Sequence, residues 1–348
     1  MKYLFAFLIP LAAFTGLQLQ SWYAPGSFYL AFVLIPILEL IFPIDTGNDS
    51  VDTGEMKRKN IFFDVILFMN LPVLYLLIYY FLIILQSQNL QISTLLMLVL
   101  NLGICTGVMG INIAHELGHR SGFINKLCAQ VLLIPACYMH FTAEHNHWHH
   151  KYVATPNDPS SARLNESLFH FWFRSIFGVF KNAINIEIKR LKLKQHGFIH
   201  WSNRILWQLM IQIIYLGLCF QIAGYIGLVS AIGIALISIL LLESINYIEH
   251  YGLQRLRPES RDFESVNEMH SWNSDHVLGR IFLYELTRHP HHHKRASVKY
   301  QNLESHSKSP TLPYGYPACI LLALIPPFWF KQMNPKIKAL NPPYFKNN

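Results

Sequence analysis

Histidines gather in three short clusters of this chain, and a neutral imidazole is the protein side chain that most often binds a metal ion. The densest cluster is EHNHWHH at residues 144–150. Its His145 and His149 are four residues apart and would share one face of a helix, with His150 next to that face. Three imidazoles this close together indicate either a basic surface or a metal site.

The other two clusters favour the metal site. Upstream, His115 and His119 repeat the four-residue spacing, and downstream HPHHH occupies residues 289–293. Each cluster ends or follows a hydrophobic segment, which a solvated basic patch would not require. The residue type and spacing are typical of metal ligands. We therefore predict a metal centre with eight candidate ligands: His115, His119, His145, His149, His150, His289, His292 and His293.

Eight imidazoles are too many for one ion and suit two, since a zinc ion takes three or four protein ligands. Nitrogen ligands suit zinc, copper, iron or nickel, and we favour iron because zinc has no redox chemistry. A ninth ligand could be either His250 or His276. Carboxylates close in sequence to the candidate ligands could orient them by accepting the other ring N–H: Glu116, Glu144, Asp158 and Glu249.

The segments that carry these clusters are apolar. Of the 348 residues, 52% are hydrophobic and 14% are charged, against about 25% charged in soluble domains. The five cysteines are isolated, so we expect no disulfide framework and no thiolate-bound metal. We predict an all-α integral membrane protein, a single domain over residues 1–348, with six spans of the length that a bilayer requires: 3–20, 26–43, 61–85, 92–114, 205–221 and 225–247.

Lysine and arginine predict the orientation of these spans. The turns 21–25, 86–91 and 222–224 contain neither residue, although the chain has 28 of them. Positive charge stays in the cytoplasm, so both termini and the polar regions 115–204 and 248–348 are expected to be cytosolic, below a plasma or inner membrane. All three histidine clusters then belong to one face. We expect no nucleic-acid partner.

The motifs resemble the membrane-bound alkane monooxygenases (AlkB type) and, more distantly, the xylene monooxygenases and the fatty-acid desaturases and hydroxylases. The resemblance rests on HELGH at 115–119, residues 144–159, NYIEHYG at 246–252, and RHPHHH followed by YQNL and LPYGYP. It implies a cytosolic di-iron centre. Carried over by position, its ligands fall on His115, His119, His145, His149, His150, His250, His289, His292 and His293.

The resemblance also implies a reaction in which O2 and two electrons hydroxylate the terminal methyl group of an n-alkane. The electrons would come from a separate rubredoxin and its NAD(P)H-dependent reductase, because this chain has no dinucleotide-binding fingerprint and no paired cysteines. The cytosolic cations could dock that carrier or contact anionic lipid. Two positions depart from the family pattern: Trp148 replaces a glycine and His291 an aspartate, which bears on the substrate more than on the metal centre.

Other hypotheses remain open. An acyl-lipid or aromatic-methyl hydroxylase or desaturase would use the same metal site on another substrate. HELGH also fits the H-E-x-x-H motif of an intramembrane zinc protease, with Glu116 as general base, but this leaves two histidine clusters without a role. A metal transporter or sensor would need ionisable residues along the spans, and these are few, among them Glu39 and Glu243.

Overall fold

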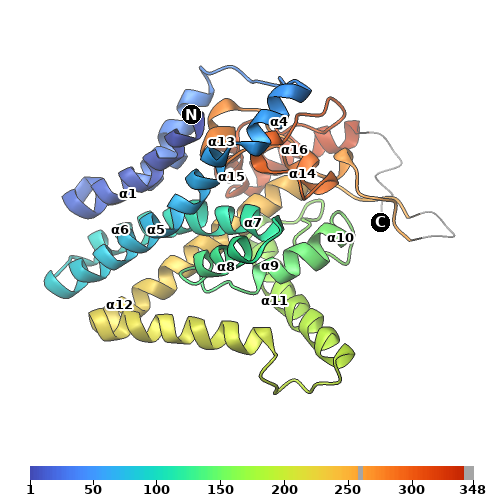
Figure 1. Ribbon diagram of the computed structural model, residues 1–348. Helices are drawn as coiled ribbons and strands as arrows, with labels where there is room; N and C mark the ends of the chain where they lie inside the picture. The colour runs from blue at the N-terminus through green and yellow to red at the C-terminus, as the bar shows by residue number, and fades with distance from the viewer. Residues whose placement is uncertain (258–261, 341–348) are drawn as a thin grey trace. The chain divides into compact units, whose positions relative to one another are not determined.

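The computed structural model describes residues 1–257 and 262–340 and is helical throughout that part, with no β-strand (Figure 1). The predicted all-α class is therefore confirmed. The chain divides into two compact units. Unit 1 comprises Met1–Val33, Ile61–Glu144 and Phe180–Leu242, and unit 2 comprises Leu34–Asn60, His145–Val179 and Glu243–Asn348 as far as it is described. The single-domain organisation stays a prediction.

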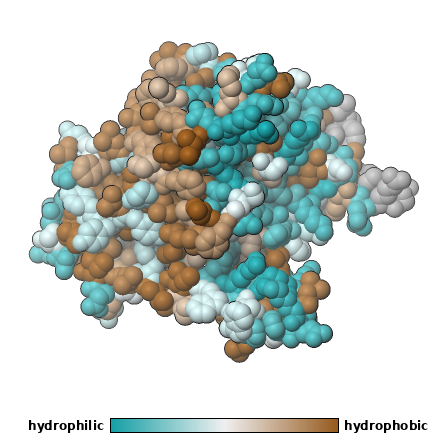
Figure 2. All heavy atoms as spheres, viewed as in Figure 1, coloured by the Kyte–Doolittle hydropathy of each residue, from teal (hydrophilic) through white to brown (hydrophobic). Residues whose placement is uncertain are grey.

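Unit 1 is built from long apolar helices. Its elements are η1 (Lys2–Phe7), α1 (Leu8–Leu19), η2 (Ser21–Tyr23), α2 (Gly26–Phe28), η3 (Tyr29–Leu34, ending at the unit boundary), α5 (Ile61–Ser87), α6 (Ile92–Cys105), η4 (Thr106–Ile111), α7 (Asn112–His119), α8 (Phe123–Leu132), α9 (Phe141–Glu144), the end of α11 (Leu168–Leu193) and most of α12 (Arg204–His250). Figure 2 shows hydrophobic residues spread over the surface of α1 and α5. Such a surface suits lipid rather than water.

Four helical stretches in the described residues are long and apolar enough to cross a membrane: Lys2–Leu19, Ile61–Ser87, Ile92–His119 and Arg204–His250. The last is broken at Ala223 and Gly224, where the backbone leaves the helical region. Gly224 has φ +61, which glycine adopts without strain. The predicted spans 205–221 and 225–247 lie on either side of this break.

The predicted span 26–43 is shorter than expected, because its helix covers only Gly26–Glu39. The protein is an integral membrane protein by its apolar helices. The number of six spans and their orientation stay predictions.

Unit 2 is built from short helices joined by ordered loops. Its elements are α3 (Ile35–Glu39), α4 (Val51–Lys59), η5 (His145–His149), α10 (His150–Tyr152), the start of α11, the end of α12, η6 (Glu268–His270), α13 (Val277–Phe282), α14 (His289–Lys294), η7 (Tyr300–Asn302), α15 (Tyr316–Ala323) and α16 (Pro326–Ala339). Aromatic rings form part of its core. The buried Trp329 ring lies 5.7 Å from the Tyr247 ring and 5.4 Å from the Tyr251 ring.

Glycine in the NYIEHYG motif ends α12 next to the proposed metal ligands. Gly252 has φ +70, a left-handed conformation that costs an L side chain about 1 kcal/mol or more. A Cβ at this position would also collide with the side chain of Ile337 in α16. The helix therefore stops after His250, and the chain continues beside the loop after η5, where the Gly252 N–H donates to the Ala162 carbonyl and the Arg255 N–H to the Ala154 carbonyl.

Candidate metal centre

The second histidine cluster is wound as a π-helix, η5, rather than as the α-helix that its spacing predicted. In a π-helix the hydrogen bonds join residues five apart. Accordingly, the Nε2 atoms of His145 and His150 lie 3.0 Å apart, and the Nε2 of His292 lies 3.1 Å from that of His150. We call His145, His150 and His292 the three-histidine group. The predicted pair His145 and His149 still stacks, with ring centroids 5.0 Å apart.

A second group consists of His149, His250, His289 and His293, all four of which are buried in unit 2. One ring nitrogen of each lies within 4.8 Å of those of the other three. The Nε2 atoms of His289 and His293 are 2.8 Å apart. Two nitrogens bound to one tetrahedral ion lie about 3.3 Å apart, given metal–nitrogen bonds of about 2.0–2.1 Å. This four-histidine group is therefore close to the arrangement that an ion requires.

Hydrogen bonds behind the rings direct two of these imidazoles. The Nδ1 of His149 lies 2.9 Å from the carboxylate of Asp158, which also accepts a 2.6 Å hydrogen bond from the Ser161 hydroxyl. The Nδ1 of His250 lies 3.3 Å from the His270 carbonyl oxygen. An N–H at Nδ1 leaves the Nε2 lone pair available.

The Nε2 atoms of His149 and His250 are buried, and within the described part of the chain neither has a hydrogen-bond partner. A buried polar atom in this state costs about 1–3 kcal/mol, which a bound metal ion would recover. The protonation state of His293 also suits metal binding, because burial and the neighbouring imidazoles hold its pKa well below the usual value and so keep a ring nitrogen unprotonated. Burial raises the pKa of Asp158, but the contact with His149 outweighs it and keeps the carboxyl ionised.

Glu249 contacts the four-histidine group at His289. Its Oε2 is 3.2 Å from the Nε2 of His289, and its Oε1 accepts a 2.9 Å hydrogen bond from the Tyr316 hydroxyl. Glu249 was predicted to contact a ligand because it precedes His250 in the sequence. Tyr316 was not predicted as a site residue. The only sequence signal for it was the LPYGYP phrase, which spans 312–317.

The first histidine cluster belongs to unit 1. The rings of His115 and His119 lie 4.9 Å apart on one face of α7, as their spacing predicted. The Glu116 carboxylate pairs with Arg120 at 2.8 Å, and Arg120 also reaches Asp64 at 2.6 Å. The second carboxylate of unit 1, Glu144, accepts a 3.2 Å hydrogen bond from the Asn182 amide. A meeting of His115 and His119 with the histidines of unit 2 stays a prediction.

His276, the alternative ninth ligand, lies outside both histidine groups of unit 2. It precedes α13, and its Nδ1 is 3.0 Å from the Ser274 hydroxyl. The geometry therefore favours His250. Trp148 extends along its own loop, where its indole N–H donates a 2.9 Å hydrogen bond to the Asn157 carbonyl and its ring lies 4.7 Å from that of Tyr152.

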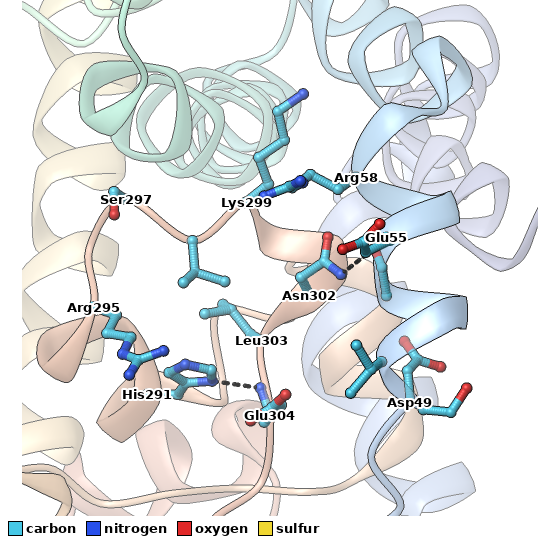
Figure 3. Close-up of a pocket in the computed structure, with 14 residues that line it drawn as sticks. Asp49, Glu55, Arg58, His291, Arg295, Ser297, Lys299, Asn302, Leu303 and Glu304 are labelled. Atoms are coloured by element: carbon cyan, nitrogen blue, oxygen red, sulfur yellow. Dashed lines mark hydrogen bonds between the residues drawn. The ribbon is translucent and has the colours of Figure 1, made fainter.

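His291 is not part of the four-histidine group and lines a pocket of about 610 Å³ in unit 2 (Figure 3). Its Nδ1 accepts a 2.8 Å hydrogen bond from the backbone N–H of Glu304. Burial, with help from nearby cationic residues, lowers the pKa of His291 to about 4. The rest of the wall is of mixed charge, with Arg58, Arg295 and Lys299 among acidic residues. The replacement of the family's aspartate by His291 therefore changes a residue that lines this pocket.

Residues 92–322, more than half of the chain, match the fatty acid desaturase family. The chain belongs to this family. Alkane 1-monooxygenase 2 of Pseudomonas aeruginosa is 35% identical over 349 residues, covering 96% of this chain and 92% of the relative. Alkane 1-monooxygenase of Acinetobacter baylyi is 31% identical, covering 93% and 79%. The xylene/toluene monooxygenase hydroxylase component XylM of Pseudomonas putida is 26% identical, covering 95% and 88%.

These comparisons confirm the resemblance to the alkane monooxygenases within the desaturase family. The family match spans all three histidine clusters, since it begins before His115 and ends after Tyr316. The two histidine groups of unit 2 therefore lie in the part of the chain that defines its family.

Proposed function

We propose that this chain is a membrane-bound di-iron alkane monooxygenase, which converts n-alkanes to primary alcohols at the terminal methyl group. The full-length similarity to alkane 1-monooxygenases supports the reaction. The single observation that carries the metal centre is the four-histidine group. Its imidazoles are buried, and two of them present an Nε2 atom that lacks a hydrogen-bond partner among the described residues.

Nine histidines hold the two ions in this proposal. One ion takes the four-histidine group, a complete set of four ligands for a single ion. The three-histidine group would hold the other ion, and His115 and His119 are assigned to that ion from the family resemblance alone. Asp158 orients His149 by accepting its Nδ1–H, and the His270 carbonyl does the same for His250. The Glu249 carboxylate, which accepts a hydrogen bond from the Tyr316 hydroxyl, contacts the Nε2 of His289 at the edge of this group.

The overall reaction consumes one alkane, one O2, two electrons and two protons, and yields one primary alcohol and one water. Two iron ions, when bound, supply the redox chemistry that breaks a strong C–H bond without an acid–base handle. Burial lowers the pKa of His293 well below its usual value, so this ring stays uncharged at neutral pH. The buried setting also keeps bulk water away from the four-histidine group.

The electrons come from a separate carrier, which we propose to be a rubredoxin served by an NAD(P)H-dependent reductase. The five cysteines of this chain are free and scattered, so none forms the paired motif of an iron–sulfur centre. We place the metal centre and both termini on the cytosolic side of a plasma or inner membrane, from the distribution of lysine and arginine. The alkane enters from the bilayer.

Metal analysis of the purified protein, combined with turnover of a mid-length alkane by rubredoxin, reductase and NADH, tests this proposal. We expect two irons per chain and a primary alcohol that forms only with O2. One zinc per chain without O2 consumption would overturn it and favour the H-E-x-x-H protease. The His147→Ala variant provides a matched control, because His147 is exposed and lies outside both histidine groups.

Hydroxylation of an aromatic methyl group is the second candidate function. The xylene/toluene monooxygenase component XylM is 26% identical over nearly the whole chain and supports this alternative. Competition between an n-alkane and toluene at equal concentration distinguishes the two: benzyl alcohol as the main product would favour the aromatic substrate. Two irons with neither product would redirect the proposal to an acyl-lipid hydroxylase or desaturase.

A further inference from the structure

A short segment, from the last two residues of α11 into the loop before α12, exposes large apolar side chains in unit 1. This 192–201 segment has the sequence KLKQHGFIHW. The side chains of Leu193, Ile199 and Trp201 are 87%, 92% and 78% exposed, and that of Phe198 is 42% exposed. Few globular loops leave several large apolar residues this open, and such a cluster marks an interaction site.

Hydrogen bonds hold this segment in one conformation, so the exposure is not that of a loose loop. Asn203 donates its amide N–H to the Phe198 carbonyl at 2.8 Å and caps α12 by accepting the N–H of Ile205 at 2.9 Å. The Trp207 indole donates to the Trp201 carbonyl at 2.6 Å. The rings of His196 and His200 stack, with centroids 3.8 Å apart.

The base of the segment is fixed as well. Glu187 accepts two hydrogen bonds from Arg190, at 2.8 Å and 2.6 Å, and one from the backbone N–H of Arg204 at 2.7 Å. Arg190 also donates to the Ser202 carbonyl. The end of α11 and the start of α12 are thereby tied together, and the apolar side chains are presented outward by a folded support.

Charge and position identify what this surface contacts. Lys192 and Lys194 flank Leu193 and are both exposed, and residues 192–203 contain no acidic side chain. The segment leads directly into α12, which is apolar enough to cross a membrane. Tryptophan and lysine within a few residues of the end of a span are typical of the boundary between lipid headgroups and acyl chains. An acidic protein would match the lysines but not the four apolar side chains.

We propose that the 192–201 segment is a membrane anchor, which inserts Leu193, Phe198, Ile199 and Trp201 into the headgroup–acyl boundary while Lys192 and Lys194 bind anionic phospholipid. The sequence predicted only that the polar region 115–204 is cytosolic and assigned no role to this segment. It is independent of the proposed function, because it involves no histidine of either metal group.

An environment-sensitive fluorophore on Ile199→Cys tests the anchor in nanodiscs. The matched control is the same label on Lys308→Cys, an exposed polar position in unit 2, and the unsubstituted chain measures labelling of the native cysteines. We expect the label at position 199 to emit at shorter wavelength than the control. It should be quenched by lipids that carry a spin label near the headgroup and should be at least about threefold less accessible to iodide.

The lysines are tested by comparing quenching from spin-labelled phosphatidylglycerol with quenching from spin-labelled phosphatidylcholine. We expect phosphatidylglycerol to quench more strongly. The Lys192→Gln/Lys194→Gln variant should lose this preference. The ratio of phosphatidylglycerol to phosphatidylcholine quenching should fall by up to about fivefold for each lysine at low salt. The proposal is overturned if iodide quenches the labels at positions 199 and 308 equally, or if the label at position 199 is shielded only when a soluble acidic protein is added. Equal quenching by both lipids in the parent chain would overturn the role of the lysines.

Discussion

The two histidine groups of unit 2 differ in how completely their surroundings prepare them for an ion. The four-histidine group is buried at every position and includes rings whose Nδ1 atoms are held by Asp158 and the His270 carbonyl. The three-histidine group includes the partly exposed His150 and consists of imidazoles that face one another. One group supplies a full set of four ligands, and the other needs ligands from elsewhere.

This difference indicates two roles within one centre. Rings that are buried and fixed from behind hold an ion tightly, because little side-chain entropy is lost on binding. The three-histidine group, with its partly exposed His150, would hold an ion less tightly. We therefore expect substitutions around the four-histidine group to affect metal retention most strongly.

The largest effect is expected from His149→Ala. This change removes a ligand and leaves the buried Asp158 carboxylate without its imidazole contact. We expect one iron per chain to be lost, with alkane turnover reduced by at least about 100-fold, since even residues behind the ligands are worth about 10–100-fold. Iron analysis and alcohol formation measure this. His147→Ala, two residues away and exposed, should retain both irons; equal loss in both variants would contradict the assignment.

A smaller effect is expected from Asp158→Asn, which keeps the shape and removes the charge. The amide oxygen can still accept a hydrogen bond from His149 Nδ1–H, but the amide NH2 can equally donate to Nδ1, so the ring tautomer with a lone pair at Nε2 is less strongly favoured. We expect iron affinity at the four-histidine group to fall by about 10–100-fold. Titration with a competing chelator measures it. Asp52→Asn, in the exposed face of α4, is the control. Unchanged affinity would show that Asp158 serves folding alone.

The sequence predicted which histidines are candidate ligands, but not how they group. Cluster spacing selected eight of the nine histidines, because a metal site needs a residue type that is rare in apolar segments. It did not predict the π-helix that turns His145 toward His150. A π-helix differs from an α-helix by about one residue per turn, and no residue type in this short cluster indicates that difference. The break at Gly224 was visible as a turn between two apolar runs. The contact between Glu249 and Tyr316 joins residues 67 positions apart, which no local pattern encodes.

An effect smaller than that of Asp158→Asn is expected from Tyr316→Phe. The variant retains the buried ring but removes the hydroxyl that donates to the Glu249 carboxylate. A buried acceptor that loses its donor costs about 1–3 kcal/mol. We expect a lower Tm and iron affinity reduced by a few-fold, less than for Asp158→Asn, because Glu249 keeps its contact with His289. Thermal unfolding with and without iron separates the two effects. The partly exposed Tyr314→Phe is the matched control.

The smallest effect on the metal is expected from His291→Ala, although His291 is adjacent in sequence to His292. Its ring accepts the Glu304 N–H beside the pocket and belongs to neither of the two histidine groups. The loss of one hydrogen bond should destabilise this loop by about 0.5–1.5 kcal/mol, while both irons are retained. Hydrogen exchange at the Glu304 amide measures the loss of loop stability, and iron analysis measures how much metal is retained. If His291→Ala lost an iron as His149→Ala does, the division between the metal-binding groups and the pocket wall would be wrong, and the third cluster would act as a single unit.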